Sequence, residues 1–307
     1  MTKQAPLPFL RGTFSWSKLG FFHAVPPPVD LLSAKALDPE NPWLFLASAI
    51  EHAKGGDHSL IPRLRQWFSR GEEGHLDRIC ILLTGDAGRE ADLRALNPLM
   101  RQGPDTLRTY ACEGAAQAGY LWQVPDMLEA WSLVSNVADH QTIGYAIAAL
   151  LEAPGGPIAE EAGSSNVDPD TVAKTENPKL RELLQRIVET QTSPPEFEVL
   201  VRDKLTELRE QFGTDQVVIW QGERFNVHRL AEKLYALVTG PEMPSISFIP
   251  ERHKFEAATG INCSDFFRED RFQPLAAAEI FETFLEVYAA NAYSDGVRYF
   301  FGHRIPD

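Results

Sequence analysis

The residue of this chain whose surroundings best suit nucleophilic chemistry is Cys263, which follows a predicted turn at residues 259–262. His253 lies ten residues earlier and is the nearest histidine that could act as its base. Thiol catalysis needs such a base beside the sulfur, together with hydrogen-bond donors for an oxyanion. Only the turn itself could supply those donors locally, so we expect Cys263 to be a buried structural cysteine.

Other catalytic patterns are missing from the sequence. It contains no phosphate-binding G-x-x-x-x-G-K-[ST], no G-x-G-x-x-G after a strand, no G-x-S-x-G and no H-E-x-x-H. The histidines are scattered along the chain: His23, His52, His58, His75, His140, His228, His253 and His303. We therefore expect no metal, no cofactor and no enzymatic activity.

The charge balance bears on the class of partner. The net charge is −14, and it divides into −4 over residues 1–152 and −10 over the remaining residues. This acidity disfavours nucleic acid and anionic membranes, which require clustered Lys and Arg. It suits a basic protein partner through complementary fields. Solubility alone would explain the same charge equally well.

The cysteine content and the N-terminal sequence indicate a compartment. The three cysteines are widely separated and form no C-x-x-C, which argues against a disulfide framework and fits a reducing compartment. Pro6 and Pro8 fall where the apolar core of a signal peptide would lie. No apolar run approaches the length of a membrane span. We expect a cytoplasmic protein.

The elements that would position these residues begin after residues 1–41, an aromatic-rich segment interpreted as an N-terminal cap. Helix endings then recur in residues 42–152, at Gly55, Gly85, Gly119 and residues 150–153, spaced by 30, 34 and 34 residues. Second helices are predicted at residues 60–68, 91–100 and 124–137. Asp57, Asp105 and Asp139 are expected as helix N-caps. A period near 34 is typical of stacked helix pairs.

Two segments carry a family resemblance. Residues 107–119 (LRTYACEGAAQAG) and 124–130 (VPDMLEA) combine a small-residue helix, a glycine turn and a Val-Pro helix start. They resemble a bacterial HEAT-like repeat. The resemblance implies an α-solenoid over residues 42–152.

The second half divides into a linker and a helical region. Residues 153–178 open with APGGP, contain few apolar residues and are interpreted as a flexible linker. Residues 179–307 are expected to form a helical C-terminal domain, whose tail residues Phe300 and Phe301 are expected to be buried. The helices predicted there span residues 180–188, 197–212, 228–238 and 274–291, with one small β-hairpin near residues 217–227. The fold class expected for the whole chain is therefore mainly α.

The helix at residues 197–212 offers a candidate partner-binding face. Its acidic residues are Glu196, Glu198, Asp203, Glu207 and Glu210. The alternative is that these carboxylates are simply the solvated side of an amphipathic helix.

The organisation of the chain also resembles the immunity proteins that protect bacteria from polymorphic or contact-dependent toxins. The likeness rests on the helical repeats, on residues 255–262 (FEAATGIN) and on residues 298–306 (RYFFGHRIP). It implies a non-enzymatic protein that binds a cognate toxin domain, which the charge suggests is basic. Two alternatives are a repeat scaffold with several partners and an enzyme with a site between the two halves.

Overall fold

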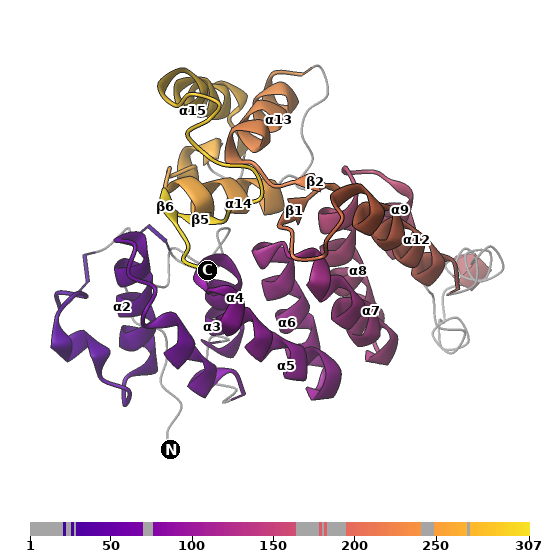
Figure 1. Cartoon of the computed structure of the whole chain (residues 1–307), viewed down its shortest axis with the longest axis horizontal. Coiled ribbons are helices and arrows are strands. Elements are labelled where there is room, and N and C mark those ends of the chain that lie inside the picture. The colour runs from indigo at the N-terminus through magenta and orange to yellow at the C-terminus, as the bar shows by residue number, and fades with distance from the viewer. Residues whose placement is uncertain are drawn as a thin grey trace. The chain divides into compact units, whose positions relative to one another are not determined.

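The computed structural model describes residues 21–22, 26–27, 29–69, 76–163, 178–179, 181–182, 195–240, 249–268 and 271–307 (Figure 1). The fold is mainly helical, as predicted. The described residues contain three two-stranded antiparallel sheets, where the sequence predicted one hairpin. None of the described helices is long and apolar enough to cross a membrane.

The chain divides into two compact units. The first combines Met1–Ala95 with Arg224–Asp307, and the second is Leu96–Glu223. These boundaries differ from the predicted ones at residues 152 and 178, because the first unit is built from the two ends of the sequence.

The N-terminal part of the first unit is a set of short helices. They are η1 Ala34–Leu37, α2 Pro42–Lys54, η2 Ile61–Trp67, α3 Leu76–Ala87 and α4 Glu90–Leu93. Asn41 starts α2, because its side chain accepts a hydrogen bond from Leu44 N (3.1 Å). The core between α2 and η2 includes Trp43, Phe45 and Trp67, all fully buried. Two predictions are wrong here: Gly85 lies inside α3 and does not end a helix, and Asp57 caps a turn at Ser59 and not the start of a helix.

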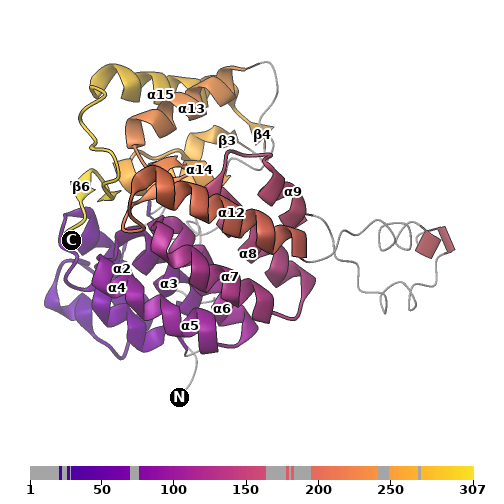
Figure 2. The ribbon, with the colours of Figure 1, turned by 45° about the vertical axis from the view of Figure 1, so that its right-hand side comes forward.

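The C-terminal part of the first unit centres on three helices, α13 Val227–Thr239, α14 Ile249–Thr259 and α15 Pro274–Val287. Helix α13 packs against both α14 and α15, and the α13–α15 pair is visible in Figures 1 and 2. The other elements are η6 Ser264–Phe266, β3 Phe267–Arg268, β4 Arg271–Phe272, β5 Tyr299–Phe300 and β6 His303–Arg304. Helices α13 and α15 were predicted, although α15 ends before residue 291. Helix α14 was not.

The second unit is a stack of helices that pack on their sequence neighbours. They are α5 Asn97–Gln102, α6 Asp105–Ala118, η4 Leu121–Gln123, α7 Val124–Leu133, α8 Val137–Leu151, α9 Pro157–Gly163 and α12 Pro195–Phe212, followed by strand β1 Ile219–Trp220. The second unit ends within strand β2 Glu223–Arg224. Helix α6 contacts α5, α7 and α8, and α8 contacts α7, α9 and α12. The short 3-10 helix η3 Arg94–Leu96 precedes this stack.

Several predicted boundaries in the second unit hold and others shift. Helix α6 ends at Gly119, which adopts φ +82°, as the glycine pattern indicated. Residue 137 begins α8 instead of ending the preceding helix, because the Asn136 side chain caps α8 through Asp139 N (2.9 Å). Asp105 and Asp139 therefore lie in first turns and are not N-caps.

The predicted flexible linker is partly a packed helix. Within residues 153–163 the chain makes a turn and then forms α9, which packs on α8 and has Ile158 and Ala162 buried. Gly144 makes this possible, since a Cβ atom there would lie 2.8 Å from the Cβ of Ala162. The rest of the linker, residues 164–177, and most of the helix predicted at 180–188 lie outside the described residues.

Gly144→Ala is expected to destabilise the protein by about 1–3 kcal/mol through overpacking against α9. This would occur although alanine is the better helix former. Ala162→Gly should relieve the clash, so the double variant should be more stable than the two single changes predict. Urea unfolding of the four proteins measures this coupling, and strictly additive effects would contradict the packing of α9 on α8.

The C-terminal tail packs within the first unit. Phe300 is fully buried, with ring centroids 5.5 Å from Phe21 and 5.1 Å from Phe301. Phe301 is only half-buried and has φ +50°, so the expectation of burial holds for Phe300 and not for Phe301. Gly260 must lack a side chain here, because its own φ is +74° and an added Cβ would lie 2.6 Å from the Phe301 ring.

Phe300→Ala is expected to lower the free energy of unfolding by about 3–5 kcal/mol, from lost transfer energy and the cavity left behind. Leu275→Ala is the control, because Leu275 is 85% exposed and its loss should change stability by less than about 0.5 kcal/mol. Chemical denaturation of both variants measures these changes. Equal and small changes in the free energy of unfolding would show that the tail does not pack.

Candidate functional site

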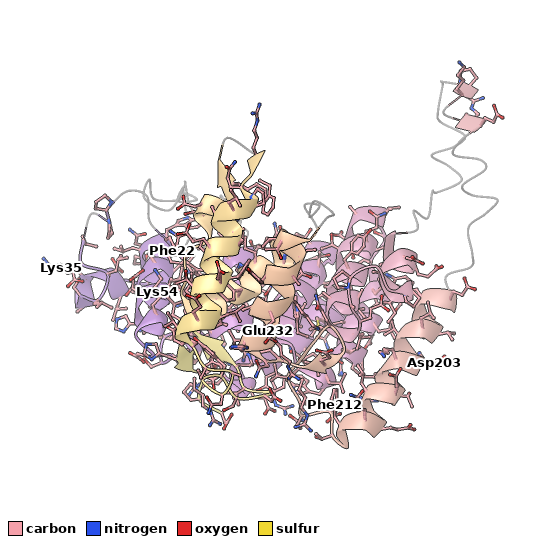
Figure 3. The ribbon with its side chains drawn as sticks, turned by 90° about the horizontal axis from the view of Figure 1, so that it is seen from above. Phe22, Lys35, Lys54, Asp203, Phe212 and Glu232 are labelled. Atoms are coloured by element: carbon pink, nitrogen blue, oxygen red, sulfur yellow. The ribbon has the colours of Figure 1, made fainter. Side chains whose placement is uncertain are left out.

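Four of the five predicted partner-binding carboxylates lie along one face of α12. The buried face of this helix is formed by Phe197, Val201, Leu205 and Leu208. At about 100° per residue, the other side presents a sector of roughly 60° that holds Glu196, Asp203, Glu207 and Glu210. All four are exposed. We call these four residues the acidic stripe; Figure 3 shows Asp203 midway along α12 and Phe212 at its end.

Glu198 does not belong to this stripe. It lies about 150° away around the helix. Its carboxylate accepts hydrogen bonds from Arg202 Nη2 (2.5 Å) and Nε (2.8 Å), an i,i+4 pair. The sequence therefore placed five carboxylates on one helix correctly, but the helix separates Glu198 from the other four.

The acidic stripe is only partly neutralised. Glu207 pairs with Lys204 (2.8 Å) three residues earlier. Within the described parts of the chain, no ion pair involves Glu196, Asp203 or Glu210. The stripe therefore presents negative charge to solvent along much of α12.

A groove runs beside the stripe, within the second unit. Its volume is about 570 Å³. One wall is the α12 face formed by Leu200, Asp203, Lys204 and Glu207, and the other is the turn from Glu152 to Ile158. Ile158 is buried and Leu200 half-buried, so the groove joins an apolar floor to an acidic rim.

The sequence interpretation missed the second wall of this groove. The glycines and prolines of the sequence APGGP led to the prediction of a flexible segment. Pro157 at a helix start and the i,i+4 pair Ile158 and Ala162 instead indicate a short packed helix. Those two signals could have identified the turn and α9.

Cys263 does not have the surroundings of a nucleophile. Its side chain is fully buried, and burial raises the pKa of the thiol well above its usual value. The Sγ donates to Ile261 O (3.7 Å), whereas His253 Nε2 is 2.9 Å from an Asp86 carboxylate oxygen. Among the described residues no hydrogen bond joins Cys263 to His253, so a structural role for this cysteine fits the geometry.

Helix α14 concentrates buried charge in the first unit. Five of its residues are ionisable and no more than 9% exposed: Glu251, Arg252, His253, Lys254 and Glu256. Sequence reasoning missed them, because a run of charged residues is usually a solvated face. The apolar residues Phe255, Ala257 and Ala258 among the charged ones are the only sequence signal that this helix is buried.

The neighbours of α14 account for this burial. His253 pairs with Asp86 of α3, and its ring stacks on Phe21 with centroids 5.4 Å apart. The Arg252 guanidinium lies over the Phe266 ring, 4.9 Å from its centroid, and the Lys254 ammonium lies 4.9 Å from that of Phe225. Glu256 accepts a hydrogen bond from Cys263 N (2.7 Å). These are structural contacts within one unit.

Burial brings the pKa values of two α14 side chains to about 7. Desolvation raises the pKa of Glu256 to about 7. Desolvation, with repulsion from Arg298, lowers the pKa of Lys254 to about 7. The cavity beside Asp86, Lys254 and Arg298 has a volume of about 10 Å³, which holds at most about one water molecule. The groove of the second unit is therefore the better candidate for binding another molecule.

Comparisons with known proteins add no family to this picture: no family model, no curated protein and no solved structure matches the chain. Among the described residues, no group of three or more His, Cys, Asp or Glu side chains could hold a metal ion.

Glu256→Gln is expected to change how stability depends on pH. Because the folded pKa is about 7 and the ordinary value is 4.5, the folded state binds more protons than the unfolded state between these values. The contribution of Glu256 to the free energy of unfolding therefore falls as the pH rises from 4.5 to about 7. The stability of the variant relative to the native protein should rise by about 3 kcal/mol between pH 4.5 and 8.

Denaturant unfolding at several pH values measures this change. Glu282→Gln is the matched control, because Glu282 is exposed on α15 of the same unit. It should leave the pH dependence almost unaltered. A Glu256→Gln profile parallel to that of the native protein would show that Glu256 titrates normally.

Proposed function

We propose that this chain is a protein-binding protein that recognises a basic protein partner through the acidic stripe of α12. The observation that carries the proposal is the run of Glu196, Asp203 and Glu210, exposed and without ion pairs among the described residues, beside a groove. Uncompensated charge of one sign on a rigid helix raises encounter rates with a partner of opposite sign and selects against others.

The partner we propose is the toxin domain of a bacterial polymorphic or contact-dependent system, with this chain acting in the cytoplasm as its immunity protein. The resemblance of residues 255–262 and 298–306 to such proteins supports this class. An immunity protein acts by occupying its toxin, which needs a complementary surface and no chemistry of its own. The stripe and the groove would supply that surface.

A repeat scaffold is the second candidate. It is favoured by the packing of α6 on α5 and α7, and of α8 on α7 and α9, as successive helix neighbours. Such a succession is what a HEAT-like solenoid would have. A scaffold would bind several partners, and its binding would not depend on a single toxin.

Replacing Asp203, Glu207 and Glu210 together by Lys is expected to slow association with the toxin domain encoded beside this gene by roughly ten-fold or more at low salt, because the steering field reverses. Replacing Glu279, Glu282 and Glu286 together by Lys is the control. These residues are exposed on α15, and the change in net charge is identical.

Stopped-flow kinetics across a salt series measure the association and dissociation rates. For the native protein the association rate should fall with salt, since exposed charges are screened beyond about 10 Å at 0.1 M, while dissociation should change little. An association rate independent of salt would reject the role of the stripe. No binding to that domain would reject the immunity function, and the scaffold would then be preferred.

A further inference from the structure

One wall of the groove beside the acidic stripe, the turn from Glu152 to Ile158, is held by hydrogen bonds within its own sequence. The Glu152 carboxylate accepts a hydrogen bond from Ala159 N (2.7 Å) at the start of α9, and Gly156 N donates to Ala153 O (3.2 Å). Gly155 adopts φ +78°, and an added Cβ on Gly156 would lie 2.4 Å from the Glu152 carboxyl carbon. The turn is thus held closely by its own sequence. A preformed wall reduces the entropy lost when a ligand binds.

The size of the groove suits a short peptide segment better than the broad surface of a folded domain. Its volume of about 570 Å³ falls within the range of about 300–1,000 Å³ that small-ligand pockets occupy. Several side chains of an extended peptide could lie in it. A folded domain could enter it only through a loop or a terminus.

The lining specifies the chemistry of that segment. Leu200 and Pro154 offer apolar surface above the buried Ile158, and Asp203 and Glu207 stand at the rim. Long basic side chains match both features, because their methylene stems cover apolar surface while the charged end reaches a carboxylate. Lys204 shows this arrangement within the protein, since its side chain is 29% exposed and its ammonium reaches Glu207.

Arginine fits this rim better than lysine. Lys204 already neutralises Glu207, and the Glu152 carboxylate accepts a hydrogen bond from Ala159 N. Asp203 is therefore the groove carboxylate that has neither an ion pair nor a hydrogen bond from its side chain among the described residues. A guanidinium can bind one carboxylate with two parallel hydrogen bonds, whereas an ammonium acts as a point charge.

We propose that the groove between α12 and residues 152–158 receives an extended, arginine-containing segment of the protein partner, with one guanidinium on Asp203 and the apolar side chain two residues away on Leu200 and Pro154, because residues i and i+2 of an extended chain share a face. This inference rests on the proposed function and names the part of the partner that is recognised. The acidic stripe governs how fast the partner arrives, and the groove governs how long it stays.

The test uses a fluorescein-labelled nine-residue peptide, RSLSRSLSR, in which arginine and leucine lie two residues apart and so share one face of an extended chain. It is titrated with the full chain in fluorescence anisotropy. Ala153→Trp fills the groove from an exposed lining position, and Asp203→Asn removes the rim charge without changing its shape. Each should weaken peptide binding at least ten-fold. Ala138→Trp and Glu282→Gln are the matched controls at exposed positions that do not line the groove, and they should bind as the native protein does.

A peptide in which citrulline replaces arginine should bind at least ten-fold more weakly to the native protein. Circular dichroism establishes that each variant folds; if Ala153→Trp does not, Asp203→Asn and the citrulline peptide decide alone. Absence of saturable binding to the native protein, or equal binding by all variants, would overturn the groove proposal.

The same variants with the toxin domain separate this inference from the proposed function. Faster dissociation of Ala153→Trp and Asp203→Asn supports the groove as the anchoring site. Dissociation at the native rate, together with slowed association of the stripe reversal, would reject the groove and leave the proposed function standing. If the native protein binds the peptide but not the toxin domain, the groove stands and the immunity function fails.

Discussion

The first unit depends on one short segment that completes the ends of two helices. Arg298 donates through Nη1 to Gly88 O (2.5 Å) and through Nη2 to the carbonyl oxygens of Gly85 and Asp86, at the end of α3. A few residues later, Phe301 N and Gly302 N donate to Ala257 O and Ala258 O, each at 2.8 Å, at the end of α14. Buried helix ends need such partners, because the last carbonyl groups have none within the helix.

This capping explains how α14 can bury so much charge. Asp86 is held at the end of α3, where it meets His253, and the tail that carries Arg298 places Phe300 in the same core. Removing one member of such an arrangement leaves another buried group without compensation, which costs more than the pair contributes. The charged residues of α14 and the aromatic tail are therefore one structural system, although they are distant in the sequence.

The sequence predicted helices whose apolar faces point to a single side. Phe197, Val201, Leu205 and Leu208 repeat at helical spacing, and α12 followed with its glycine end at Gly213. The stripe on its outer face followed from the same periodicity. Helix α14 could not be found this way, because its burial is supplied by partners on α3 and the tail and leaves no apolar stripe of its own. The prediction was wrong at the start of α9, because the glycines and prolines there form a constrained turn and not a flexible segment.

The division of the first unit into two stretches of sequence also bears on how the chain folds. Arg298 and Gly85 hydrogen-bond across 213 positions, and the whole second unit is synthesised between them. The second unit is continuous and can fold as soon as it is made, whereas α3 must wait for its last partners until the end of synthesis. Contacts so distant in sequence form slowly, and chains that wait for them expose apolar surface that aggregates. The order of synthesis thus makes the first unit the last to complete its core, with the apolar residues of α3 uncovered while the second unit is made.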